Sequence, residues 1–84
     1  MIHILKNIRK NLKIKQHVIS EIIKCNQGNF SKIEDGIMIP KKIKDIEKIY
    51  GNYLINELEK QIQIKNSEIK QYQKFISDIV ENLI

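Results

Sequence analysis

Side chains that can hydrogen-bond with nucleic-acid bases lie close together between residues 27 and 32. Gln27 can donate to and accept from one adenine, and Lys32 can reach a guanine or a phosphate oxygen. Asn29 is a further polar residue between them, and Gly28 belongs to the same stretch although it offers no side chain. These residues are therefore candidates for contact with base edges or with the backbone of a nucleic acid.

Positive charge gathers in the same half of the chain. Residues 1–50 carry eleven Lys and Arg against five Asp and Glu, whereas residues 51–84 carry four against five. Such an excess beside a candidate reading segment is typical of proteins that bind polyanions. Lys15, Lys41 and Lys42 are therefore candidates for phosphate contacts, although a solvated surface explains any single lysine equally well.

No combination of residues in the sequence predicts catalysis or a cofactor. His3, His17 and Cys25 are the strongest potential metal ligands, and their spacing does not match a zinc site. Cys25 is better explained as a small apolar residue in a turn. A lone cysteine cannot form an intramolecular disulfide, and no apolar run is long enough to span a bilayer. We expect a cytoplasmic protein that is not an enzyme and holds no metal or small molecule.

The elements that must position these side chains are two short helices between Gln16 and Gly36. The first has apolar residues at positions 18, 19, 22 and 23, which places them on one helical face. Asn26 is a suitable N-cap for the second, because its side-chain oxygen can accept from a free backbone N–H. Phe30 and Ile33 supply the buried face of the second helix, and Gly36 suits its end. Two such helices form a helix-turn-helix.

This segment resembles the lambda-repressor-like (Cro/CI, or XRE) helix-turn-helix family. The matching features are Gln16 at the start of the first helix, Ile19, Ser20 and Ile23 within it, and the ending Ser31-Lys32-Ile33-Glu34-Asp35-Gly36. The resemblance covers about residues 4–58. It implies a five-helix DNA-binding domain in which Gln16 contacts a phosphate, with Asn26 as a second candidate. It also implies a structural ion pair between Arg9 and Glu34.

Three positions depart from the pattern of that family. The family has Gly where this chain has Lys24 and Lys13, and Ser or Thr where it has Lys15. A residue other than Gly at position 24 must adopt an uncommon backbone conformation or reshape the turn, at a cost of about 1 kcal/mol. Gly28 weakens the second helix by roughly 0.5–1 kcal/mol relative to Ala.

Further helices are expected at residues 2–13 and 41–50, the latter ended by Gly51, with Asn52 as the cap of the next helix. We expect residues 1–52 to form the DNA-binding domain. From residue 53 a heptad pattern predicts one long helix of about 46 Å that pairs with other chains. Its seam consists of Ile55, Leu58, Ile62, Lys65, Ile69, Tyr72, Ile76, Ile79 and Leu83. The alternative is that this segment bends back onto the first domain.

These features together predict an all-α protein of prokaryotic or phage type that regulates transcription. We expect it to act as a repressor and to bind double-stranded DNA as a homodimer or higher oligomer on a two-fold operator. The alternative is a protein-interaction module, such as an antitoxin-like partner protein, that uses the C-terminal coiled coil. A polar first turn in the second helix of the pair favours DNA, because a protein-binding groove should show apolar anchors there.

Overall fold

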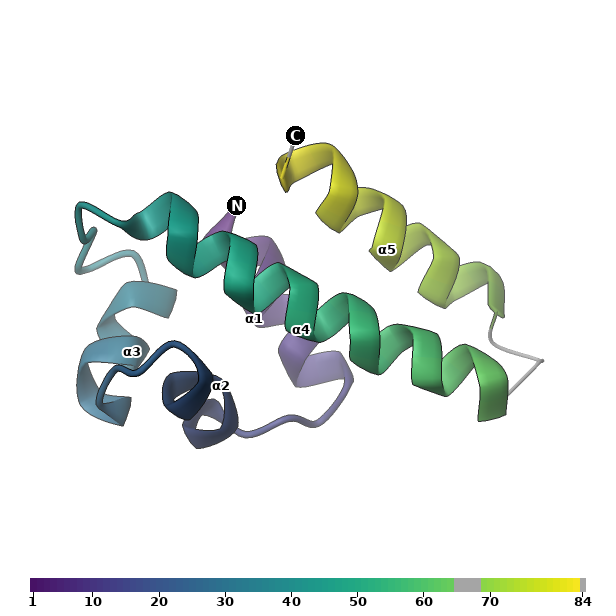
Figure 1. The fold of residues 1–84 in the computed structure, drawn as a ribbon, viewed down its shortest axis with the longest axis horizontal. Helices are drawn as coiled ribbons and strands as arrows, with labels where there is room; N and C mark the ends of the chain where they lie inside the picture. Colours follow the sequence, from purple (N-terminus) through teal and green to yellow (C-terminus); the bar gives the residue numbers. More distant parts are fainter. Residues whose placement is uncertain (65–68, 84) are drawn as a thin grey trace.

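Residues 1–64 and 69–83, which the computed structural model describes, form five α-helices and no strand (Figure 1). The helices are α1 (Ile2–Asn11), α2 (Gln16–Ile22), α3 (Gln27–Glu34), α4 (Ile43–Ile64) and α5 (Ile69–Leu83). The all-α class that the sequence predicts is confirmed. None of the helices in this part of the chain combines the length and apolar character that crossing a bilayer requires.

Each of the first three helices buries one apolar face in a common core. Leu5 and Ile8 of α1 are three residues apart and both are buried, as are Ile19 of α2 and Phe30 of α3. The spacing of three explains why one side of α1 is covered while its other side carries charges. This packing holds α2 against α3 and α4, and α3 against α1.

Helix α4 is longer than the sequence analysis expects. The expected end at Gly51 and the expected cap at Asn52 are wrong, because α4 continues from Ile43 to Ile64. Gly51 is buried in the middle of this helix, where a Cβ atom would lie 3.0 Å from a methyl carbon of Leu83. A Gly inside a helix costs roughly 1 kcal/mol relative to Ala. Here it allows α5 to approach the backbone of α4 closely, so tertiary packing outweighs local propensity.

The C-terminal segment does not form the single long helix that the heptad pattern predicts. Helix α4 ends at Ile64, α5 begins at Ile69, and α5 returns alongside α4 on the side away from α2 and α3 (Figure 1). The longest dimension of the molecule is 37 Å, shorter than the expected helix. The structure therefore follows the alternative in which the segment bends back onto the preceding helices.

The heptad residues pack inside the chain. Leu58 and Ile79 are completely buried in the core, and the other seam residues whose side chains are described lie against that core or are partly buried: Ile55, Ile62, Tyr72, Ile76 and Leu83. Lys65 lies outside the described residues, as does the side chain of Ile69. Because α5 folds back onto α4, the heptad residues are buried against their own chain and need no second chain to cover them.

The domain boundary expected at residue 52 falls inside α4. Tyr50, Leu54 and Leu58 lie on successive turns of this helix and none has any exposed area. They belong to the same core cluster as Leu5 of α1 and Ile79 of α5. One continuous core therefore joins the two segments that the sequence analysis separates.

Candidate nucleic-acid interface

Helix α3 presents a polar face to solvent. Gln27, Gly28, Asn29 and Lys32 are all exposed, whereas Phe30 and Ile33 on the other side of the helix are buried. The Phe30 ring packs against Tyr50 of α4, with 5.6 Å between ring centroids. The structure thus brings together the four candidates for base contact and fixes them to the core through the opposite face.

Asn26 caps α3 as the sequence predicts. Its side-chain oxygen accepts a hydrogen bond of 2.7 Å from the backbone N–H of Asn29. This bond satisfies one of the free donors at the start of the helix. Asn26 is exposed, and a phosphate contact by its side chain stays a prediction.

Three turns in this part of the molecule share one hydrogen-bonding pattern. After α3, Gly36 has φ +75°, its N–H donates to Ile33 O, and the next N–H donates to Lys32 O. This is the Schellman motif, in which a left-handed residue closes a helix. The turns after α1 and α2 close in the same way, but their left-handed residues are Lys13 (φ 59°) and Lys24 (φ 57°). Lys24 therefore keeps the turn by adopting the uncommon conformation.

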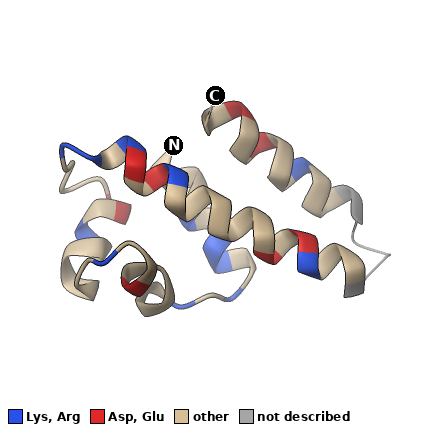
Figure 2. Cartoon of the chain, in the orientation of Figure 1, with Lys and Arg blue, Asp and Glu red and all other residues tan. Residues whose placement is uncertain are grey.

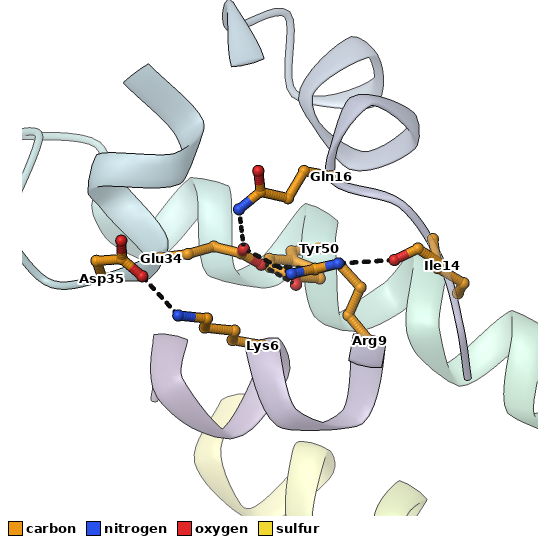
Figure 3. Close-up of polar contacts among 7 residues, drawn as sticks. All are labelled: Lys6, Arg9, Ile14, Gln16, Glu34, Asp35 and Tyr50. Atoms are coloured by element: carbon orange, nitrogen blue, oxygen red, sulfur yellow. Dashed lines mark hydrogen bonds and ion pairs between the residues drawn. The ribbon is translucent and has the colours of Figure 1, made fainter. Parts of the chain in front are cut away.

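A buried carboxylate connects α3 to three other helices (Figure 3). Glu34 at the end of α3 forms the expected ion pair with Arg9, with distances of 2.9 Å from Nε to Oε2 and 3.0 Å from Nη2 to Oε1. The side chain of Glu34 is completely buried and that of Arg9 is 7% exposed. Arg9 Nη1 also donates to the carbonyl oxygen of Ile14, in the connection between α1 and α2.

Two further donors complete the surroundings of this carboxylate. Gln16 Nε2, from the first residue of α2, donates to Glu34 Oε1 at 2.9 Å, and the Tyr50 hydroxyl of α4 donates to Oε2. Each carboxylate oxygen thus accepts two hydrogen bonds. No buried side-chain nitrogen or oxygen atom among the described residues lacks a partner. A buried charge is tolerated only when it is paired and hydrogen-bonded in this way.

The network changes how its members ionise. Burial, followed by the hydrogen bond to Glu34, raises the pKa of Tyr50 well above its ordinary value. Burial alone would lower the pKa of Arg9, but the hydrogen bonds and negative charge of Glu34 raise it overall. Arg9 therefore stays charged and the Tyr50 hydroxyl keeps its proton at neutral pH.

Outside this network, Lys6 of α1 forms an ion pair of 2.5 Å with Asp35, directly after α3. The hydrogen bond and the positive charge of Lys6 lower the pKa of Asp35. The sequence analysis missed this pair as well as the contacts of Gln16 and Tyr50 with Glu34. Side chains that lie 16 to 29 residues apart in sequence carry no local signal that they meet.

The lysines expected to contact phosphate are exposed. Lys15 precedes α2, and Lys41 and Lys42 precede α4. Figure 2 shows basic residues in the connections around α2 and α3 and at the start of α4, while the end of α5 carries acidic residues. The connections around α2 and α3 are therefore rich in basic residues, although acidic residues also lie on α2 and at the start of α4.

The loop between α3 and α4 adds an unexpected feature. Ile37 and Ile39 are 76% and 77% exposed, the highest values among the large exposed apolar side chains of the described residues. In the sequence they lie between α3 and the two lysines that precede α4. Cys25 is half-buried against the core, and no group of three potential ligands for a metal ion occurs within residues 1–64 and 69–83.

Comparison of the chain with models of protein families, with curated proteins and with solved structures found no match.

Proposed function

We propose that this protein is a sequence-specific, double-stranded DNA-binding regulator of transcription, with α2 and α3 as a helix-turn-helix of the lambda-repressor-like type. The observation that carries this proposal is the exposed polar face of α3 with Gln27, Asn29 and Lys32. A helix with such a face fits the major groove with its N-terminal turn. Repression would follow from occupying a promoter.

In this proposal, side chains divide into two groups by what they contact. Gln27 and Asn29 read base edges, with Lys32 reaching a base or a phosphate. Gln16, Asn26, Lys15, Lys41 and Lys42 contact the phosphate backbone, which sets register and affinity rather than sequence. The basic connections around α2 and α3 support this division (Figure 2).

The test is selection of bound duplexes from a random DNA library, followed by sequencing. We expect an enriched sequence, and Gln27→Ala should relax base preference within it. Lys42→Ala should weaken binding to all sequences alike. It should also reduce the slope of log affinity against log salt concentration by about one, because one counterion fewer is released. Lys74→Ala, which changes an exposed lysine of α5, is the matched control and should do neither. Failure of the library to enrich any sequence would refute the proposal.

A homodimer on a two-fold operator is part of the proposal, because one small domain contacts few bases. The heptad residues are packed inside the chain, so a second copy would need a different surface from the one expected. Sedimentation with and without the selected DNA measures this directly. An enriched inverted repeat with half-sites about 34 Å apart would support the dimer.

The exposed loop favours a second candidate function, a protein-interaction module. Ile37 and Ile39 are apolar anchors of the kind that a protein partner would cover. Changing both to Ser should leave DNA binding intact if the loop serves a protein partner. If the double change abolishes association between copies or with a partner while DNA selection yields nothing, the interaction module is the better description.

A further inference from the structure

The hydrogen bonds around Glu34 fix the orientation of the Gln16 amide. A carboxylate only accepts hydrogen bonds, so the Gln16 group that faces it must be the NH2 group. The distance from Gln16 Nε2 to Glu34 Oε1 is 2.9 Å, and Figure 3 shows the Gln16 carbonyl oxygen directed away from Glu34. Gln16 is half-buried at the first residue of α2, and Glu34 takes only one of the two N–H groups of its amide, which leaves the second able to donate.

The position of Glu34 depends in turn on Tyr50. Arg9 binds both carboxylate oxygens, but only Tyr50 supplies the second donor to Oε2. The Tyr50 ring has no exposed area and packs against Phe30 of α3, so its hydroxyl is held in place. Without that hydroxyl, Oε2 would keep only Arg9 Nε as a partner, and the carboxylate would be held by three donors instead of four. The Glu34 oxygen that Gln16 binds belongs to this same carboxylate, so its position would be less tightly fixed.

We propose that Tyr50 is a positioning residue for DNA: acting through Glu34, it holds the Gln16 amide with one N–H ready for a phosphate oxygen. This inference rests on the proposed function and adds a role for a buried residue of α4. A side chain that is already held loses less conformational entropy on binding. For one side chain, this smaller loss raises the affinity about 3–10-fold.

A purely structural role for Tyr50 predicts different results. The hydroxyl would then contribute to stability, and its loss would lower the melting temperature without changing the affinity of folded protein for DNA. Action through Gln16 instead predicts that the effects of changing Tyr50 and Gln16 on DNA affinity are not additive. A double-mutant cycle separates the two roles.

The experiment compares Tyr50→Phe, Gln16→Ala and the double variant, with Tyr53→Phe as the matched control, since Tyr53 lies one turn later on α4 outside the network. Binding to the selected duplex is measured over a range of salt concentrations. We expect Tyr50→Phe and Gln16→Ala each to weaken binding about 3–10-fold and to leave the salt slope unchanged, because Gln16 is uncharged and releases no counterion. The double variant should bind like Gln16→Ala alone, and Tyr53→Phe like the parent.

Additive effects, or Tyr50→Phe behaving like Tyr53→Phe, would overturn the inference. If Tyr50→Phe does not fold, an unchanged affinity of Gln16→Ala for the duplex would still overturn the inference, because it would rule out the phosphate contact. The side-chain amide signals of Gln16 in a 1H–15N spectrum of the free protein test the anchoring without DNA. We expect Tyr50→Phe to shift them and Tyr53→Phe not to, and signals unmoved by either change would overturn the inference. Shifted signals in a protein that selects no DNA would instead refute the proposed function and, with it, the role of Tyr50 in DNA binding.

Discussion

Replacing Lys24 with Gly is expected to make the protein more stable. Lys24 closes the turn between α2 and α3 with φ 57°, a conformation that costs an L-residue roughly 1–2 kcal/mol. Gly adopts it freely, but Gly also makes the unfolded chain more flexible, which costs about 0.4–1 kcal/mol. The difference is a gain of about 0.5–1 kcal/mol. For a domain of this size that corresponds to a rise of about 2–8 °C in melting temperature.

Urea unfolding followed by circular dichroism measures this gain. With a slope of about 1–1.5 kcal/mol per molar urea, the midpoint should rise by about 0.5 M. Lys13→Gly, with φ 59°, should act in the same direction. The matched control is Lys48→Gly, an exposed lysine within α4, where the same chemical change should destabilise by about 1 kcal/mol.

The reverse substitution completes the test. Gly36 has φ +75°, and nothing lies within 4 Å of where its Cβ would be, so Gly36→Lys changes only the backbone preference. We expect it to lose about what Lys24→Gly gains. A Lys24→Gly variant that unfolds at the same or a lower urea concentration would refute the argument that strain in this turn is relieved by Gly.

Three further changes should alter stability in defined directions. Gly28→Ala should raise it by about 0.5–1 kcal/mol, because the added Cβ makes only an ordinary contact; a lower melting temperature would contradict this. Gly51→Val should lower it by about 1–3 kcal/mol, because even a Cβ there would lie 3.0 Å from α5, and an unchanged urea midpoint would argue against the close approach. Lys6 lowers the folded-state pKa of Asp35. The parent should therefore be more stable to unfolding than Asp35→Asn, with the full difference above about pH 4, and the difference should vanish as the pH falls through the lowered pKa. A stability difference in melts that persists at the lowest pH would contradict that assignment.

The ends of α3 were predictable because the signals for them are local. Asn26 caps the helix through a residue three positions away, and Gly36 closes it in a left-handed conformation. Both depend on the backbone preferences of single residues. The same reasoning failed for Gly51, because a Gly that permits close packing has the same sequence appearance as one that ends a helix.

The course of the C-terminal segment was not predictable from its pattern. A spacing of three and four places apolar residues on one face, but the pattern is the same whether that face meets another chain or the same chain. Leu58 and Ile79 meet the core of their own chain. Only tertiary structure decides between these two partners, and for the same reason the contacts of Gln16 and Tyr50 with Glu34 were missed.

The carboxylate of Glu34 contributes to the stability of the fold and also holds Gln16, which is proposed to contact DNA. Substitutions of the residues bonded to this carboxylate differ in how much they destabilise the fold. A chain of 84 residues is stable by about 5–10 kcal/mol in total. Removing either partner of the buried Arg9–Glu34 pair would cost about 3–5 kcal/mol, because the remaining charge would stay buried without compensation. Gln16 is only half-buried, and Tyr50→Phe would remove only a hydroxyl from the network, so these two changes cost less. The proposed DNA contact can therefore be altered through Gln16 and Tyr50 while the fold persists, but not through the ion pair that both of them depend on.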